Sequence, residues 1–162
     1  MTNKPNIAFD FTEGGEYAPR EGYKTVERDN IAAIIKYQGK YLLLRYNDTN
    51  YSYSLVTGGI EKDEDKIEAV RREVIEETGY TDIESIQAVD CINKSRFFVE
   101  HKNQNRVATY YPYLVLLKSL ERSQIAENEE HEHTCHWIKD DELDGADIFD
   151  NHRRMLMAAK KI

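Results

Sequence analysis

Residues 58–80 read GGIEKDEDKIEAVRREVIEETGY and carry the clearest helix pattern in the chain. Asp65 is a suitable N-cap, Glu68 three residues later completes a capping box, and Gly79 suits the C-terminal cap. These signals predict a helix over residues 66–78. The two glycines that open the stretch are expected to form a loop before the helix, because glycine adopts backbone conformations that are closed to other residues.

The predicted helix has an apolar face beside an acidic one. At 3.6 residues per turn, Ile67, Val70 and Val74 fall on one stripe that should pack inward. The adjacent arc carries three carboxylates: Glu73, Glu76 and Glu77. Like charges at these spacings cost an isolated helix about 0.2–0.5 kcal/mol per pair. A hard divalent cation such as Mg²⁺ or Mn²⁺ would offset that repulsion; the alternative is a solvated acidic face, which is what most such clusters are.

The spacing within this stretch is also specific. After the first glycine come five residues, a glutamate, seven residues and an Arg-Glu pair. The fixed positions of this pattern are Gly58, Glu64, Arg72, Glu73, Glu76, Glu77 and Gly79. The pattern resembles the signature of the Nudix hydrolase family at every fixed position. One departure is Thr57, which stands where members often have proline, and it affects loop rigidity more than metal binding.

The resemblance implies a fold and an activity. The fold is of the α/β class, a Nudix-like α/β/α sandwich with a central mixed β-sheet, running from about residue 30 to the end of the chain. The activity is metal-dependent hydrolysis of a pyrophosphate bond in a nucleoside diphosphate linked to another group. The cofactor is usually Mg²⁺, with Mn²⁺ as a substitute.

The resemblance also implies roles for individual residues. The expected metal ligands are Glu73, Glu76 and Glu77, and Arg72 would orient one of these carboxylates by a charge-assisted hydrogen bond. Glu73, Glu76 and Arg72 are therefore the catalytic candidates on the helix. Other candidates around the substrate are Gly58 and Gly59, which would let the loop approach closely, and Glu64 as a further acidic group. Arg45 is added as a substrate candidate because it is a basic residue on a predicted strand, independently of the resemblance.

A second acidic segment, residues 123–132, precedes the strand that contains Trp137. In the family the general base is not always on the helix and can come from a loop across the cleft. The candidates in this segment are Glu127, Glu129, Glu130 and Glu132, of which Glu130 is taken as the catalytic candidate. The alternative is a solvated acidic loop, the usual role of such runs.

Three smaller patterns have weaker functional interpretations. His131, His133 and Cys135 alternate on one predicted strand face, which would permit zinc, but the only further candidate ligand, His136, lies on the opposite face. Several basic strand residues either clamp phosphates or pair with surface acids: Arg45, Lys94, Arg96 and Arg106. Several strand aromatics either stack on a base or belong to the core: Tyr51, Tyr53, Phe97, Phe98, Tyr110 and Tyr111.

The rest of the chain predicts a sheet and a second helix. Residues 1–29 are interpreted as an extended N-terminal arm and residues 30–162 as the Nudix hydrolase domain. Strands are expected at 30–36, 40–46, 51–57, 83–93, 96–100, 106–117 and 134–139. Pro112 implies a bulge or an edge within its strand. A terminal helix is expected at 149–161, with Met155, Leu156 and Ala159 facing inward.

Composition narrows the class of protein. The chain has 162 residues, enough for one domain, and a net charge of −8, which opposes nucleic-acid and anionic membrane surfaces. No apolar run is long enough to span a membrane, there is no signal peptide pattern, and the two cysteines are far apart, so a cytoplasmic protein is expected. The expected partner is a small nucleotide, and the expected assembly is a monomer or homodimer.

Several functions remain open on the sequence alone. A nucleoside triphosphate or another small nucleotide is favoured as substrate. One alternative is a catalytically weak nucleotide-binding or sensing module, although such a module has little reason to keep three mutually repelling carboxylates. Another is an RNA 5′-end pyrophosphohydrolase, for which the acidic surface is unfavourable.

Overall fold

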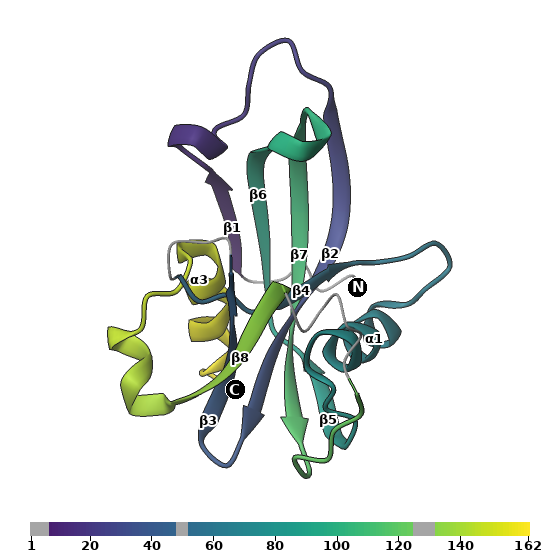
Figure 1. Cartoon of the computed structure of the whole chain (residues 1–162), viewed down its shortest axis with the longest axis vertical. Helices are drawn as coiled ribbons and strands as arrows, with labels where there is room; N and C mark the ends of the chain where they lie inside the picture. Colours follow the sequence, from purple (N-terminus) through teal and green to yellow (C-terminus); the bar gives the residue numbers. More distant parts are fainter. Residues whose placement is uncertain (1–6, 48–51, 125–131) are drawn as a thin grey trace.

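A mixed sheet forms the centre of the molecule (Figure 1). The computed structural model describes residues 7–47, 52–124 and 132–162. The sheet has eight strands in the order β1-β6-β7-β2-β3-β8, with β4 added to β2 and β5 added to β7. The strands are β1 (Ile7–Thr12), β2 (Thr25–Tyr37), β3 (Lys40–Tyr46), β4 (Val56–Gly59), β5 (Ile83–Ala88), β6 (Cys91–Val99), β7 (Gln104–Leu117) and β8 (His133–Lys139). The helices are α1 (Lys66–Thr78), α3 (Asp150–Ala159) and the short 3₁₀ turns η1 (Gly15–Tyr17), η2 (Glu100–Lys102) and η3 (Asp140–Gly145).

Two hydrophobic cores lie on opposite faces of the sheet, as the near-continuous apolar run of β2 requires. On one face, Ile31 and Ile35 pack with Val70 and Val74 of α1. On the other face, Ile34 packs in the core that contains the buried α3 residues Met155, Leu156 and Ala159. The predicted α/β fold around a mixed sheet is confirmed, and so are the inward-facing residues of the terminal helix. None of the helices in the described ranges has the length and apolar character that crossing a membrane would need.

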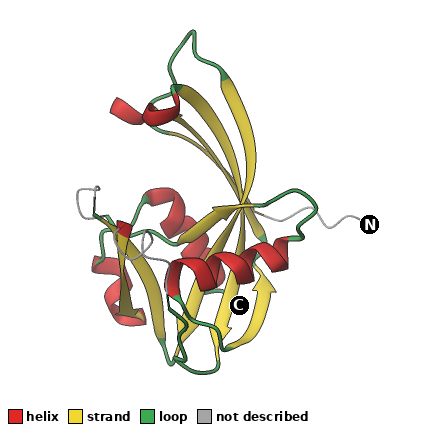
Figure 2. Cartoon of the chain, turned by 45° about the vertical axis from the view of Figure 1, so that its right-hand side comes forward, coloured by secondary structure: helices red, strands yellow, loops and turns green. Residues whose placement is uncertain are grey.

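The sheet continues beyond the two cores into an upper lobe formed by β1, the first part of β2, the adjoining ends of β6 and β7, and the turns η1 and η2 (Figures 1 and 2). Arg20 ties the lobe together: its guanidinium lies 2.6 Å from Glu100 and 3.8 Å from the ring centroid of Phe98. Asn105 accepts a 2.7 Å hydrogen bond from the main-chain nitrogen of Arg20 and donates one of 2.7 Å to its carbonyl. Much of the segment interpreted as an arm, residues 7–29, is thus part of the sheet.

Some strand boundaries differ from the prediction. The strand predicted at 30–36 begins at Thr25, because β2 pairs in parallel with β7 along its length. The strand predicted at 51–57 is wrong in extent: its regular part is β4, which contains both glycines. The strand predicted at 83–93 is two strands, β5 and β6, which meet β7 at different places.

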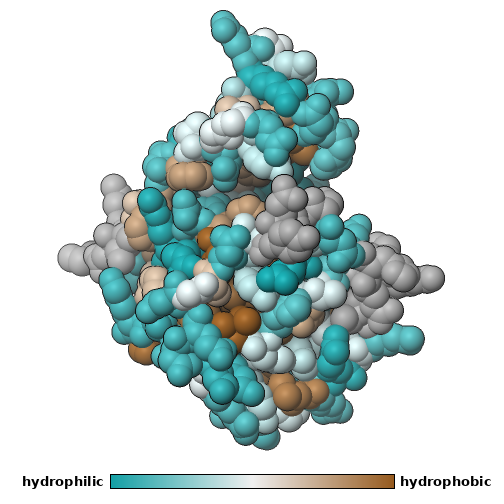
Figure 3. All heavy atoms as spheres, turned by 60° about the vertical axis from the view of Figure 1, so that its left-hand side comes forward, coloured by the Kyte–Doolittle hydropathy of each residue, from teal (hydrophilic) through white to brown (hydrophobic). Residues whose placement is uncertain are grey.

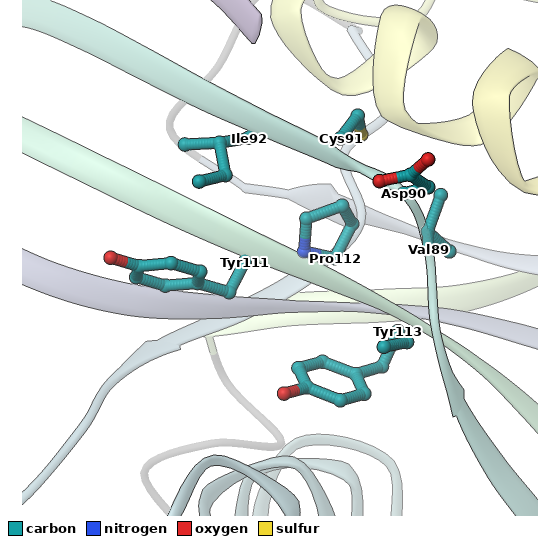
Figure 4. Close-up of a pocket in the computed structure, with 8 residues that line it drawn as sticks. Val89, Asp90, Cys91, Ile92, Tyr111, Pro112 and Tyr113 are labelled. Atoms are coloured by element: carbon teal, nitrogen blue, oxygen red, sulfur yellow. The ribbon is translucent and has the colours of Figure 1, made fainter. Parts of the chain in front are cut away.

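Pro112 lies where β7 changes its outer neighbour. Strand β6 pairs with β7 up to Tyr110, and β5 pairs with it from Tyr113 onwards. The Pro112 carbonyl accepts a 3.0 Å bond from Val89 N, so the missing proline N–H faces the gap between the two neighbours. A notch of about 300 Å³ opens there, with Tyr111 and Tyr113 on either side of Pro112 along the strand (Figure 4). The proline therefore interrupts no ladder bond, which agrees with its predicted place at an irregularity.

Candidate active site

Helix α1 has the predicted ends. The Asp65 carboxylate accepts a 2.8 Å bond from Glu68 N, and the Glu68 carboxylate accepts one of 3.1 Å from Asp65 N. Gly79 closes the helix in the left-handed conformation, with φ of 78°, and donates to Ile75 O. One side chain departs from the prediction: Ile67 is 43% exposed, because the first turn of the helix extends past the apolar core.

Arg72 organises the acidic face of α1. Its Nε and Nη2 donate to the two oxygens of Glu64 at 2.7 and 3.0 Å, and Nη2 also donates to Gly59 O at 2.9 Å. Its Nη1 donates to Glu73 at 2.6 Å and to Glu76 at 3.3 Å. These contacts use all five N–H groups of the guanidinium. Arg72 therefore joins the acidic face of the helix to β4.

Glu64 is the main counter-ion of Arg72. The hydrogen bonds from Arg72, followed by the 2.9 Å bond from Glu61 N, lower the pKa of Glu64 to about 2. A carboxylate with so low a pKa is ionised at neutral pH and is a weak base. Glu64 is therefore placed to hold Arg72 in position rather than to accept a proton.

This pair should make stability pH-dependent, and Glu64→Gln tests it. Because the pKa of Glu64 is lowered from 4.5 to about 2 on folding, its contribution is complete above pH 4.5 and is lost as pH falls towards 2. In EDTA at pH 7 we expect the variant to be less stable than wild type in urea unfolding, and the difference to shrink as the pH approaches 2. Glu84→Gln, at an exposed glutamate of β5, controls for the lost charge. A difference that is constant across this range would contradict the assignment.

Space, not backbone conformation, explains the two glycines of β4. Neither has a positive φ, so the predicted need for an unusual backbone is wrong. A Cβ atom on Gly58 would overlap the carboxylate of Glu73, and a Cβ atom on Gly59 would overlap the guanidinium of Arg28. Gly58 thus allows Glu73 to lie directly against β4.

The three candidate metal ligands leave α1 in different directions. Glu73 is mostly buried, with 11% of its side chain exposed, and Glu76 is 50% exposed, and both contact Arg72 Nη1. Glu77 turns towards β8, where its carboxylate lies 3.4 Å from His133 Nδ1. Within the described ranges, no three Asp, Glu, His or Cys side chains are gathered closely enough to hold an ion as they stand. The donor set nevertheless fits a hard divalent cation, because neighbouring carboxylate oxygens are the ligands such an ion prefers.

The histidine and cysteine pattern of β8 supports the helix. His133 Nε2 lies 2.7 Å from the carbonyl oxygen of Glu77, and Cys135 Sγ lies 4.0 Å from the same oxygen. His136 bonds instead to Thr134 at 2.7 Å. These described residues gather no zinc site, so the zinc interpretation gains no support. His131, Glu127, Glu129 and Glu130 lie outside the described residues, and Glu132 is exposed.

A pocket of about 490 Å³ lies on the α3 face of the sheet. Figure 3 brings this side forward, and apolar residues appear recessed between hydrophilic ones. Its lining includes the rings of six tyrosines and phenylalanines: Tyr17, Tyr46, Phe97, Phe98, Tyr110 and Phe149. Its polar lining includes Thr57 and Ser54, and the buried Ser54 Oγ has no hydrogen-bond partner among the described residues. Further polar lining residues include Asn151 and the carboxylates Glu13 and Glu100. Aromatic rings beside hydrogen-bonding groups suit a flat heterocycle.

His152 is a neutral polar group in this pocket. Its Nδ1 accepts a 2.9 Å hydrogen bond from Leu55 N, which defines an unprotonated nitrogen. Burial lowers the pKa of His152 to about 4, so the ring is uncharged at neutral pH. The ring therefore fixes the main chain just before β4.

Comparison with known families agrees with this geometry. The family model described as NUDIX domain matches residues 27–159. The chain belongs to the Nudix family. Nudix hydrolases act on nucleoside diphosphates linked to other groups, and the chain is an enzyme of this class.

Solved structures show the same fold at low sequence identity. The NUDIX domain of Shewanella oneidensis NrtR, complexed with ADP ribose, has a TM-score of 0.63 and 16% identity, covering 84% of this chain and 88% of that one. The Escherichia coli dihydroneopterin triphosphate pyrophosphohydrolase has a TM-score of 0.61 and 17% sequence identity, and the match covers 81% of this chain and 94% of that one. A Caenorhabditis elegans Ap4A hydrolase has a TM-score of 0.58 and 18% sequence identity, and the match covers 83% of this chain and 96% of that one. No curated protein matches the chain significantly.

In this Nudix domain the structure brings together only part of the predicted site. Glu64, Arg72, Glu73, Glu76 and Gly59 form one connected group. The predicted phosphate clamp Arg45 lies elsewhere on β3, 4.3 Å from the ring centroid of Tyr53, and does not line the pocket. The pocket residues missed by sequence reasoning include Ser54, Thr57 and His152. No local signal could have found them, because residues 54–57 and His152 come together only in the folded chain.

Proposed function

We propose that the protein is a Mg²⁺-dependent hydrolase that cleaves a pyrophosphate bond in a small nucleotide, with Mn²⁺ as a substitute metal. The observation that carries the proposal is the Arg72 network, which joins Glu64, Glu73 and Glu76 to Gly59 through the whole guanidinium. A merely solvated acidic face would not need a buried glutamate held against a glycine. We favour a nucleoside triphosphate or another small nucleotide as substrate.

The residues that would hold the metal are Glu73, Glu76 and Glu77. When bound, the ion would neutralise phosphoryl oxygens and activate water for attack. Arg72 fixes two of these carboxylates in advance, which reduces the ordering needed on binding. Glu77 would reach the site from the last turn of α1, and the contact of His133 with its carbonyl steadies that turn.

The aromatic pocket would hold the base of the nucleotide. Thr57 lines this pocket and is followed by Gly58, which lies against Glu73, so β4 links the two regions. The neutral His152 and the free hydroxyl of Ser54 offer polar contacts there. The ligands named for two structural neighbours, ADP ribose and Ap4A, are also nucleosides linked through phosphates.

The proton acceptor would come from the acidic segment, with Glu130 as candidate. Glu64 is excluded by its low pKa of about 2. Glu73 is engaged with Arg72 at 2.6 Å, which also makes it a poor base. We therefore assign the role of general base to the acidic segment rather than to Glu64 or Glu73.

The remaining proposals concern the chain as a whole. Residues 30–162 would form the catalytic domain, and residues 1–29 would complete its substrate pocket through Glu13 and Tyr17, which line it. The two free cysteines, Cys91 and Cys135, suit a reducing cytoplasm. The net charge of −8 disfavours nucleic acid as a partner, and the assembly would be a monomer or homodimer.

A substrate panel tests the proposed function. Purified protein is incubated with nucleoside triphosphates, dinucleoside polyphosphates, nucleotide sugars and capped RNA, and release of phosphate and pyrophosphate is measured. We expect hydrolysis of at least one small nucleotide with Mg²⁺ or Mn²⁺, and its loss in EDTA. Binding without hydrolysis of any compound would instead indicate the sensing module, and preference for capped RNA would indicate 5′-end processing.

A further inference from the structure

Two arginines, Arg28 and Arg106, lie close together on the α3 face of the sheet. In the parallel pairing of β2 with β7, Arg28 is opposite Ala108 and Arg106 is opposite Val26. Residues paired in this way point to the same face, so the two arginines are diagonal neighbours. Their long side chains extend from adjacent strands into one region.

The two positive charges are not neutralised. Among the residues that the structure describes, neither guanidinium forms an ion pair or a hydrogen bond, and Arg106 Nε is buried without a partner. Burial lowers the pKa of Arg106, and the positive charge of Arg28 lowers it further. Arg106 is half-buried and Arg28 is exposed, and two like charges placed together favour binding of an anion.

The neighbours of the pair place it beside the aromatic pocket, on the face of the sheet opposite Glu73. Phe97 and Tyr110 of the pocket adjoin Arg106, the first as its paired residue on β6 and the second through its electrostatic effect on Arg106. Gly59 lies against the guanidinium of Arg28, while Gly58 lies against Glu73. Along β4, Thr57 and Gly59 thus face the pocket and the arginine pair, while Gly58 between them faces α1 on the other side of the sheet.

Glu13 lines the same pocket and is the acidic residue to compare with the pair. The charge of Glu13, at the end of β1, acts on Tyr110. Glu13 is also affected by Asp150 rather than by either arginine. Within the described ranges, Glu13 forms no ion pair with Arg28 or Arg106.

We propose that Arg28 and Arg106 form a phosphate subsite that holds the phosphate next to the nucleoside. This inference rests on the proposed function. A nucleotide with its base in the aromatic pocket would place its first phosphate on the arginine pair, and its next phosphate would pass round the end of β4 at Gly59 to reach Glu73 and Glu76 on the other face of the sheet. The substrate class is therefore a nucleoside with at least two linked phosphates, and the scissile anhydride lies on the far side of the subsite from the base.

Binding of inorganic pyrophosphate in EDTA tests the subsite without catalysis. Calorimetric titration would compare wild type with Arg28→Gln, Arg106→Gln and the double variant. We expect each single change to weaken binding about 10-fold, because each removes one charge-assisted contact. The matched control is Arg154→Gln, an exposed arginine of α3 that lies 5.4 Å from the Phe9 ring centroid.

Melting temperature and hydrolysis separate the other outcomes. Removing one of two neighbouring like charges should leave the melting temperature unchanged or higher, so a large decrease would mark the arginines as structural and overturn the proposal. Pyrophosphate binding that is absent in wild type, or equal in all variants, would also overturn it, even if the substrate panel succeeds. If no anhydride is hydrolysed but binding depends on both arginines, the proposed function fails and the anion site stands.

Discussion

Replacing Glu76 with glutamine should lower kcat by about 10²- to 10⁴-fold without unfolding the protein. The Glu76 side chain is half exposed, and its one hydrogen bond within the described part of the chain is the 3.3 Å bond from Arg72. The change loses that weak pair and relieves repulsion with Glu73, so the free energy of unfolding should move by less than about 0.5 kcal/mol. Activity and melting temperature should therefore diverge.

The measurement is initial rates on a substrate from the panel, with thermal melting and Mn²⁺ titration of the same preparations. Glu84→Gln on β5 removes the same charge from an exposed site and should match wild type. Mn²⁺ affinity should fall in Glu76→Gln because one oxygen ligand is lost. If activity and melting temperature fall together, Glu76 is structural and the assignment is wrong.

In the same assay, Glu130→Gln should depress kcat and alter the acid limb of the pH–rate profile.

Replacing Gly58 with alanine should also be severe, and for a different reason. The added methyl group would overlap the Glu73 carboxylate, which cannot simply turn away because Arg72 holds it at 2.6 Å. We expect kcat to fall about 10²-fold and the free energy of unfolding to fall by about 1–3 kcal/mol. Both quantities should fall here, unlike in Glu76→Gln.

The matched control is Gly145→Ala, at the end of η3. A Cβ atom there would meet no atom within 4 Å, and the residue has no positive φ. It should keep the activity and stability of wild type. A Gly58→Ala variant with full activity would show that catalysis does not need Glu73 in its observed position. The Arg72 network would then no longer support the proposed function.

The parts of this molecule that sequence predicts are those fixed by neighbours along the chain. Asp65, Glu68 and Gly79 determine the ends of α1 through bonds within the helix itself. The spacing of Arg72 and Glu73 likewise follows from one helical segment. These features depend on local geometry, so reading the chain in order recovers them.

The parts that sequence could not predict depend on distant pairing. Strand β2 begins at Thr25 only because β7 extends beside it, and nothing near Thr25 records that partner. The role of Gly58 also could not be predicted, because a glycine in a sequence does not indicate which atom occupies the space of the absent side chain. The proposed role of Arg28 could not be predicted from the sequence either, because it depends on the nearby Arg106 of another strand.

The long pairing of β2 with β7 also affects how the chain reaches its native state. The two strands come from distant parts of the chain and pair in parallel, an arrangement that forms slowly because loop closure must precede the contacts. Until then, the apolar runs IAAII and YLVLL are exposed to other copies of the chain. Each run is followed directly by a lysine, Lys36 or Lys118, and such charges act as gatekeepers that discourage aggregation. The central strands thus carry their own protection during folding.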